Sequence, residues 1–265
     1  MFTTNSTAVR YCRTVREQCP GLYAVWPPNS RLELGDIGYL LDGVFFRKTN
    51  LMHVPHFPSE TLPWKIRRGT ARSHYAITSG GGSELTFLAR GAAGPFGRPL
   101  AKAQAKVVFS SAGSVFFNAA GCVINEIEDQ ISLGRIILKL FALGIWSDDW
   151  CVVTRIVMAA STTAAIASQR SAAIRFEAVG KNDHIDLADA STKMVATSSV
   201  GVTNMVVTTG GGTPLIGLSR VRERLFGSPV FGATELDPQD SYVIRERLLK
   251  SGSELDEVFE FIECE

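Results

Sequence analysis

The chain lacks the features that mark a membrane helix, a disulfide framework or a zinc site. Its most apolar run covers residues 136–146 and is interrupted by Lys139, whereas a helix needs about 20 apolar residues to span a bilayer. Its five cysteines are odd in number and form no Cys-x-x-Cys pair, which argues against disulfides and zinc. Residues 1–6 are polar and no apolar run follows them, so no secretory signal is predicted. We expect a chain made in the cytosol with reduced thiols.

Motifs for catalysis or cofactor binding are also missing. No Gly-x-Ser-x-Gly is present, and the four histidines are scattered. The glycine triplets at 80–82 and 210–212 are not followed by the Lys-Ser or Lys-Thr of a phosphate loop, and hairpin turns are predicted there instead. His53 and His56 have no evident third ligand, so no metal is predicted. We interpret the chain as a non-enzyme without a metal or a cofactor.

Charge is distributed unevenly along the chain. The chain has 26 acidic and 27 basic residues, and residues 251–265 hold six acids and no base, which leaves 20 acids against 27 bases and a net charge of +7 for residues 1–250. The apolar residues of this tail lie at helical spacing, i, i+3, i+4 and i+7: Leu255, Val258, Phe259 and Ile262. The pattern predicts a short acidic amphipathic helix. Such a helix either completes the core or serves as a removable lid.

Hydrophobic periodicity and turn residues predict a mixture of helices and strands. Residues 8–18 are predicted as a helix that ends at Pro20 and Gly21. Asp42-Gly43 between apolar residues predicts a hairpin. The remaining predictions are short strands within 22–55, two alternating strands within 83–118 around the loop 91–99, one or two helices within 125–146 broken near Gly134, a long strand over 151–169 with 172–179 as its returning partner, and a strand over 193–209 that ends at the second glycine triplet.

The basic residues are spread over strands and mixed with apolar residues rather than gathered on one helix. This distribution argues against nucleic acid as a partner. An anionic membrane is at least as good a partner for the basic body of the chain.

Taken together, these residues resemble a known family. The resemblance rests first on the run Leu34-Gly35-Asp36-Ile37-Gly38, with Gly43 and Phe45 after it and a cysteine in a short basic helix before it. It rests also on amphipathic strand pairs that flank a helical region and on the acidic C-terminal helix. Over essentially its whole length the chain is similar to bacterial gasdermins. The resemblance implies an α+β fold with a twisted, mainly antiparallel central sheet and flanking helices, as in the gasdermin N-domain, plus a short C-terminal inhibitory helix.

The resemblance also implies a function and a division of the chain. Residues 1–236 would be the pore-forming domain, 237–252 a cleavable linker and 253–265 the autoinhibitory segment, held down by the apolar residues of the tail. The protein would be a cytoplasmic monomer until a partner protease removes this segment. It would then form a homo-oligomer in the bacterial inner membrane and kill the cell in antiphage defence.

Individual residues take roles from this resemblance. Cys12 matches the family's palmitoylated cysteine, although the family more usually places it within the first few residues; palmitate would be the one covalent group. The other interpretation of Cys12 is a buried small apolar residue. Arg10, Arg13 and Arg16 would meet anionic lipid.

The linker contains candidate cleavage sites at Arg245, Arg247 and Lys250, for a trypsin-like or Arg-directed caspase-like protease. Cleavage after Asp237 or Asp240 is the lesser option. The stretch 245–250 is equally well interpreted as the solvated face of a helix.

Two strands are long enough for a membrane. A spanning strand needs about 9–11 residues, and Ala101–Phe109 and Cys151–Gln169 meet that length. Because a bilayer excludes unpaired backbone groups, such strands insert only in a closed assembly of several copies. Ordinary half-buried strands would have the same pattern.

The alternative function is that of a soluble binding or scaffold protein whose acidic C-terminal helix is structural.

Overall fold

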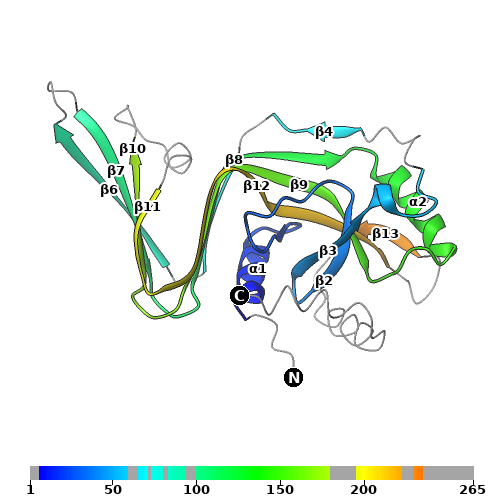
Figure 1. Cartoon of the computed structure of the whole chain (residues 1–265), viewed down its shortest axis with the longest axis horizontal. Helices are drawn as coiled ribbons and strands as arrows, with labels where there is room; N and C mark the ends of the chain where they lie inside the picture. The colour runs from blue at the N-terminus through cyan, green and yellow to red at the C-terminus, as the bar shows by residue number, and fades with distance from the viewer. Residues whose placement is uncertain are drawn as a thin grey trace.

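The computed structural model describes residues 6–58, 65–70, 73–79, 83–93, 99–179, 195–222 and 229–234. They form two antiparallel sheets with two α-helices beside the larger sheet (Figure 1). The predicted α+β class with a mainly antiparallel sheet is therefore confirmed. The elements are α1 Ser6–Gln18, β1 Tyr23–Ala24, β2 Asp36–Leu41, β3 Val44–Asn50, the 3-10 helix η1 Leu51–His53, β4 Ile66–Arg68, β5 Ser73–Thr78, β6 Ser83–Ala93, β7 Pro99–Phe109, β8 Val115–Ile127, α2 Gln130–Ala142, β9 Trp150–Ala167, β10 Ala173–Val179, β11 Val195–Val200, β12 Val202–Arg222 and β13 Val230–Ala233.

The larger sheet is built around the long strand β9. One path through it runs β1-β12-β9-β2-β3, and β8 also pairs with β9 and carries β4 and β5 on its other edge. The smaller sheet has the order β11-β10-β7-β6. Figure 1 shows the smaller sheet standing out from the larger one at a sharp bend of the strands.

The predicted hairpin at Asp42-Gly43 joins β2 to β3. Both turn residues have positive φ, 50° at Asp42 and 85° at Gly43, as a two-residue type I′ turn requires. Glycine adopts this conformation without strain, which explains its place here.

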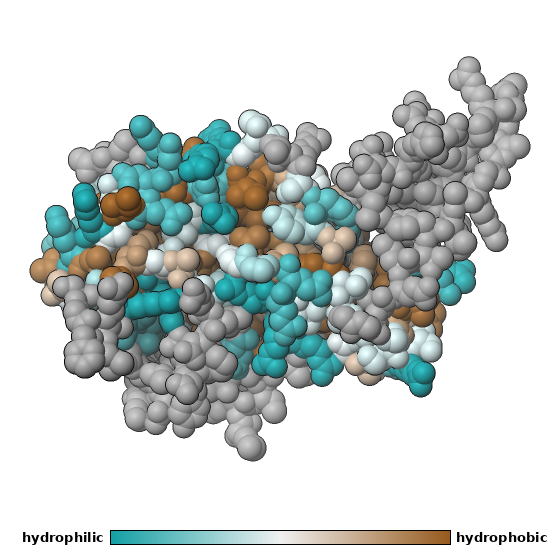
Figure 2. All heavy atoms as spheres, turned by 180° about the vertical axis from the view of Figure 1, so that it is seen from behind, coloured by the Kyte–Doolittle hydropathy of each residue, from teal (hydrophilic) through white to brown (hydrophobic). Residues whose placement is uncertain are grey.

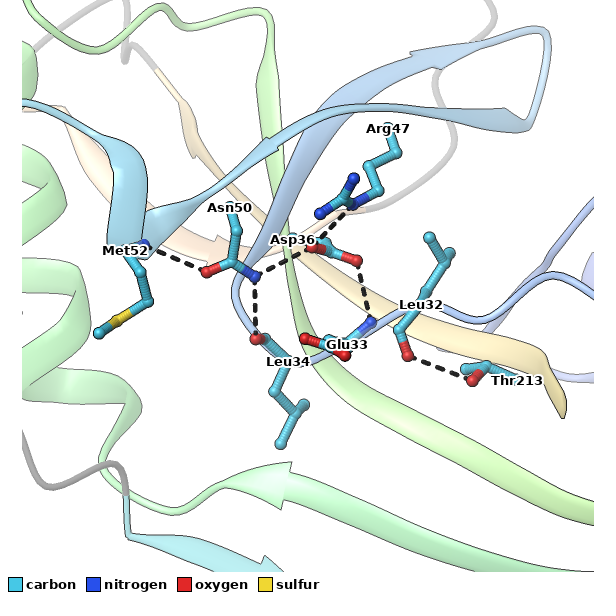
Figure 3. A network of polar contacts seen from close by, with 8 residues as sticks. All are labelled: Leu32, Glu33, Leu34, Asp36, Arg47, Asn50, Met52 and Thr213. Carbon is cyan, nitrogen blue, oxygen red and sulfur yellow. Dashed lines mark hydrogen bonds and ion pairs between the residues drawn. The ribbon is translucent and has the colours of Figure 1, made fainter. Parts of the chain in front are cut away.

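A polar network fastens the loop before β2 to the hairpin (Figure 3). Asp36 is 1% exposed; its carboxylate pairs with Arg47 Nε at 2.9 Å and accepts hydrogen bonds from Asn50 Nδ2 at 2.9 Å and from the Glu33 backbone N–H at 2.9 Å. Asn50 Oδ1 in turn accepts from the Met52 N–H at 3.1 Å. A buried carboxylate is stable only with such partners, so the Gly-Asp-Ile-Gly run has a structural role.

The helices cover separate parts of the core. Tyr11, Cys12 and Val15 of α1 pack in a cluster with Phe117 of β8 and Leu215 of β12. α2 contributes apolar residues to a second cluster; they are Leu133, Ile137 and Leu140, beside Trp146, Val152 and Val221.

The predicted helix break at Gly134 is wrong, because α2 runs through this residue without interruption. Asp129 caps the helix, with its Oδ1 accepting from the Ser132 N–H at 2.9 Å. A Cβ at position 134 would lie 3.0 Å from Phe231 Cδ1, so glycine lets β13 approach the helix. The part of the predicted helical region before Gln130 belongs to β8 up to Ile127.

The predicted turn at 210–212 is also wrong, because the triplet lies inside β12. On its two sides β12 pairs with β9, Thr209 opposite Ser161 and Gly212 opposite Ala159, with a shift of register between them. Gly211 has a φ of 92°. The glycines therefore mark an irregularity within a long strand. The triplet at 80–82 lies outside the described residues.

The prediction that 172–179 returns as the partner of the long strand is wrong as well. This segment forms β10, which pairs with β7 and β11 and not with β9. At Ser171, with a φ of 61°, the chain leaves the larger sheet, and the Ser171 N–H donates to Phe109 O at 2.9 Å.

Candidate functional site

The smaller sheet continues four neighbouring strands of the larger sheet in the same order. In the larger sheet β5, β8, β9 and β12 lie side by side in that order, and in the smaller sheet β6, β7, β10 and β11 do so. β5 leads into β6, β7 into β8, β9 into β10 and β11 into β12. Four passes of the chain therefore run through both sheets, and the two hairpins β6–β7 and β10–β11 extend the larger sheet (Figure 1).

Backbone hydrogen bonds continue through the bend between the sheets, which we call the joint. Phe109 N–H donates to Ala172 O at 2.8 Å, and Gly113 N–H donates to Ala167 O at 2.7 Å. Ser168 N–H donates to Gly201 O at 2.9 Å. These bonds tie the β7–β8 pass to the β9–β10 pass, and the β9–β10 pass to the β11–β12 pass, where the strand direction changes.

An apolar cluster fills the joint. It draws residues from strands of both sheets: Val107, Phe109, Phe116, Ala165, Ala167, Ala172 and Ile174, with Val202 packed against them. Val107, Phe109 and Ile174 are fully buried. The bases of the two hairpins are therefore anchored in a packed core and not merely joined by loops.

One face of the smaller sheet is apolar by register. Because neighbouring residues of a strand lie on opposite faces, the pairings place the following residues with the buried Val107 and Ile174: Ser83, Leu85, Phe87, Ala89, Gly91 and Ala93 of β6, Pro99, Ala101, Ala103, Ala105 and Phe109 of β7, and Phe176 and Ala178 of β10. We call this the apolar face. It carries no charged residue in the paired parts of β6, β7 and β10.

The opposite face holds the charged residues of these strands, and we call it the charged face. By the same register it holds Glu84, Thr86, Leu88, Arg90 and Ala92 of β6, Leu100, Lys102, Gln104, Lys106 and Val108 of β7, and Ala173, Arg175, Glu177 and Val179 of β10. Arg175 is exposed and Lys106 partly exposed, in contrast to their buried neighbours Ile174 and Val107. The two faces are thus chemically distinct.

The length of the first hairpin suits a bilayer. β6 and β7 have 11 residues each and are paired throughout. At about 3.3 Å per residue such a strand is roughly 36 Å long. A tilt of about 45° leaves roughly 25 Å along the membrane normal, which is the height of the apolar band of membrane strands.

The two strands predicted to be long enough to span a membrane lie in different sheets. Ala101–Phe109 lies in β7, in the smaller sheet. Cys151 onward forms β9, a mostly buried strand of the larger sheet. Its length serves the core, because it pairs with β8, β12 and β2.

Helix α1 lies beside the joint (Figure 1). The Arg10 guanidinium lies across Gly113 in the turn between β7 and β8, where a Cβ would collide with it, and Gln18 Nε2 donates to Thr78 O at the end of β5, at 2.7 Å. α1 therefore contacts both passes that lead into the first hairpin.

The three arginines predicted to meet lipid are placed differently. Arg10 and Arg13 are exposed. Arg16 donates from Nη1 to Leu22 O at 3.2 Å and lies 4.3 Å from the centre of the Tyr23 ring. Its guanidinium is thus already engaged within the domain.

The predicted lipidation residue Cys12 faces the core in this conformation. Its side chain is 1% exposed, and Sγ lies 3.5 Å from Ala24 O. Burial raises the pKa of the Cys12 thiol far above its usual value. The thiol is therefore an unreactive core group here, and it has to leave the core before an acyl chain can be attached.

The predicted cleavage sites and tail contacts lie outside the described residues. These are Arg245, Arg247, Lys250, Leu255, Val258, Phe259 and Ile262, together with the predicted linker and tail. β13, next to α2, is the last described strand before them.

The sequence predicted the amphipathic alternation of the first hairpin, which the pairing of β6 with β7 confirms, but it did not predict the joint or the combination of both hairpins in one sheet. The alternation of apolar and polar residues in β6 and β7 indicates the first hairpin. No pattern within residues 173–179 indicates that β10 pairs with β7. Among the helices of the described ranges, none is long and apolar enough to cross a membrane. Within the same ranges, no three His, Cys, Asp or Glu residues gather as metal ligands.

Comparisons with known proteins give structural matches only. No family model matches the chain, and no curated protein matches it. One similar solved structure is a bacterial gasdermin from Bradyrhizobium tropiciagri, with 12% identity, 88% of this chain and 95% of that chain covered, and a TM-score of 0.36. Another is the gasdermin A3 membrane pore, with 10% identity, 88% and 96% coverage, and a TM-score of 0.27.

Proposed function

We propose that this chain is a pore-forming protein that stays inactive until its C-terminal segment is removed. The observation that carries the proposal is the smaller sheet, whose apolar and charged faces run along a hairpin of bilayer-spanning length. In a bilayer the apolar face contacts lipid, and the charged face borders water. The protein acts through this insertion and not as an enzyme.

The edges of the smaller sheet supply the means of assembly. Within the described strands β6 pairs only with β7, and β11 pairs only with β10. Unpaired backbone groups cost several kcal/mol each in hydrocarbon. β6 of one copy therefore pairs with β11 of the next, and the copies close into a homo-oligomeric ring.

Anionic lipid and α1 orient the domain before insertion. Arg10 and Arg13 are exposed on a helix that contacts the joint, so they reach the membrane surface where the hairpins enter it. Palmitate on Cys12 is added only after α1 loosens from the core, since the thiol is buried in the closed domain.

Regulation lies in residues 237–265. Leu255, Val258, Phe259 and Ile262 hold the acidic segment on the body, and a protease cuts near Arg245, Arg247 or Lys250. The chain is cytoplasmic before the cut. Afterwards it inserts in the bacterial inner membrane and kills the cell, as antiphage defence requires.

Dye release from liposomes tests the proposal. A site for a specific protease is introduced within residues 237–252 of the full chain, and the folded protein is cut in the presence of vesicles with anionic lipid. Cutting should release the dye, and the uncut chain should not. No release after complete cutting, with no growth arrest on expression of a chain truncated between Arg245 and Lys250, would contradict the proposal in favour of a soluble binding protein.

A further inference from the structure

The charged face of the smaller sheet has an excess of positive charge. By register it holds four basic residues, Arg90, Lys102, Lys106 and Arg175, and two acidic residues, Glu84 and Glu177. The described strands of each copy therefore carry two more positive than negative charges on this face. The acidic residues do not lie opposite the basic ones, since Glu84 pairs with Val108 and Glu177 with Gln104.

The basic residues lie opposite one another in two pairs. Arg90 pairs with Lys102 between β6 and β7, and Lys106 pairs with Arg175 between β7 and β10. Like charges directly opposite destabilise a strand pair. Water and mobile anions reduce this repulsion, whereas hydrocarbon does not. The arrangement suits a face that borders an aqueous phase containing anions.

The two pairs lie at different heights along the hairpin. The pair Lys106–Arg175 is three positions from the end of β7 at the joint, and the pair Arg90–Lys102 is four positions further along β7. Repeated in every copy of a closed ring, each pair becomes a ring of positive charge. Rings of Arg or Lys are a known means of selecting anions in pores.

We propose that the charged face lines the water-filled passage of the assembled protein and makes it prefer anions to cations. This inference rests on the proposed function, because a passage exists only if the copies insert and close. The specificity-determining residues are Arg90, Lys102, Lys106 and Arg175. The permeant class is small inorganic anions.

The size of the anion preference depends on the salt concentration of the measurement. A surface charge acts over about 10 Å at 0.1 M salt and about 30 Å at 0.01 M. The preference therefore grows as the salt concentration falls. A wide passage shows it only at low salt.

The test is the reversal potential of the cut full-length chain in a planar bilayer with a tenfold KCl gradient, at about 10 mM on the dilute side. We expect a chloride-to-potassium permeability ratio of about two or more. The double variants R90E/K102E and K106E/R175E each turn the excess of two positive charges into an excess of two negative ones. Each should bring the ratio below one in the same lipid.

The matched control is R135E/K139E, which makes the same change of charge at two exposed residues of α2 and should leave the ratio unchanged. If a glutamate variant does not fold, R90Q/K102Q removes the charge alone and should bring the ratio toward one. Open channels without chloride preference, or with a ratio that the variants do not alter, overturn this inference and leave pore formation standing. No conductance after cutting, together with no dye release, overturns the proposed function and this inference with it.

Discussion

At the scale of single residues, burial determines what α1 can do. Tyr11, Cys12 and Val15 are 0%, 1% and 0% exposed, so one side of the helix belongs to the core. Arg10 and Arg13 lie on the exposed side. The same short helix thus carries core residues and the basic residues proposed to meet lipid.

The buried thiol of Cys12 predicts a pH dependence of stability. Burial raises its folded-state pKa, so above about pH 8.5 the unfolded chain releases a proton that the folded chain retains. The contribution of this thiol to the free energy of unfolding is fully present below that pH. It decreases as the pH rises, by up to about 1.4 kcal/mol per pH unit. Urea unfolding between pH 8 and 10 should show a shallower fall for Cys12→Ala than for the parent chain. Equal slopes would mean that the thiol is not buried in solution.

The hydroxyl of Tyr11 predicts a stabilising substitution. Tyr11 OH is buried, and no hydrogen-bond partner for it is found among the described residues. A buried polar group without a partner costs about 1–3 kcal/mol. Tyr11→Phe keeps the ring contacts with Trp26 and Phe117, so the free energy of unfolding should rise by about 1 kcal/mol or more.

Tyr23→Phe is the matched control for this substitution. Tyr23 OH donates to Thr234 O at 3.0 Å, so its removal should lower the free energy of unfolding by about 1 kcal/mol. The same sign for both variants in urea unfolding would contradict the placement of one of the two hydroxyls.

At the scale of elements, the network around Asp36 holds the hairpin β2–β3 to the loop before it. Asp36→Ala removes the acceptor of the Glu33 N–H and of Asn50 Nδ2, and it also removes the partner of Arg47. Arg47 is half exposed and can return to water. Since hydrogen bonds to charged groups contribute about 1.5–3 kcal/mol each, the loss should be about 3 kcal/mol.

Urea unfolding measures that loss, and Glu33→Ala is its control, because Glu33 lies in the same loop with an exposed side chain. The control should stay within about 0.5 kcal/mol of the parent chain. A similar small change for Asp36→Ala would show that the network adds little to the fold.

At the scale of the whole molecule, the joint links the soluble fold to the proposed insertion. The same four passes form the core of the larger sheet and the two hairpins. The exposed large hydrophobic residues of the described surface are Met52, Ile66, Ile131, Leu143, Met158, Val200, Met205 and Val207. Hydrophobic and hydrophilic residues are mixed on the face shown in Figure 2. In the smaller sheet, the strand register places the apolar and the charged residues on opposite faces.

Neighbouring positions on its two faces give a paired prediction for the cut chain. Phe87→Lys places a charge on the apolar face, and Thr86→Lys places the same charge on the charged face. A Lys at the lipid face costs about 2–4 kcal/mol at the bilayer centre. Phe87→Lys should therefore slow dye release by roughly tenfold or more, while Thr86→Lys should change it little.

Thermal unfolding of the uncut variants shows whether both still fold. If both variants fold and release dye at equal rates, whether both match the parent chain or both are slower, the assignment of the faces is contradicted.

The sequence by itself determined what depends on neighbours along the chain. The helix over 8–18 follows from its apolar spacing and from Pro20, and the hairpin at Asp42-Gly43 follows from turn residues that accept positive φ. The alternation of apolar and polar residues in 83–109 indicated the first hairpin, because every second residue of a strand lies on the same face. These features need no knowledge of distant contacts.

Only the tertiary structure decided how the strands combine. The pairing of β10 with β7 and not with β9, and the pairing of β12 with β9 on both sides of glycines 210–212, join residues far apart in the chain. The contact of Cys12 with Ala24 joins residues 12 positions apart, beyond the end of α1. Strand segments of similar pattern can pair with many partners, and packing of the joint selects one arrangement. The apolar and charged faces of the smaller sheet exist as continuous surfaces because that pairing brings the hairpins together.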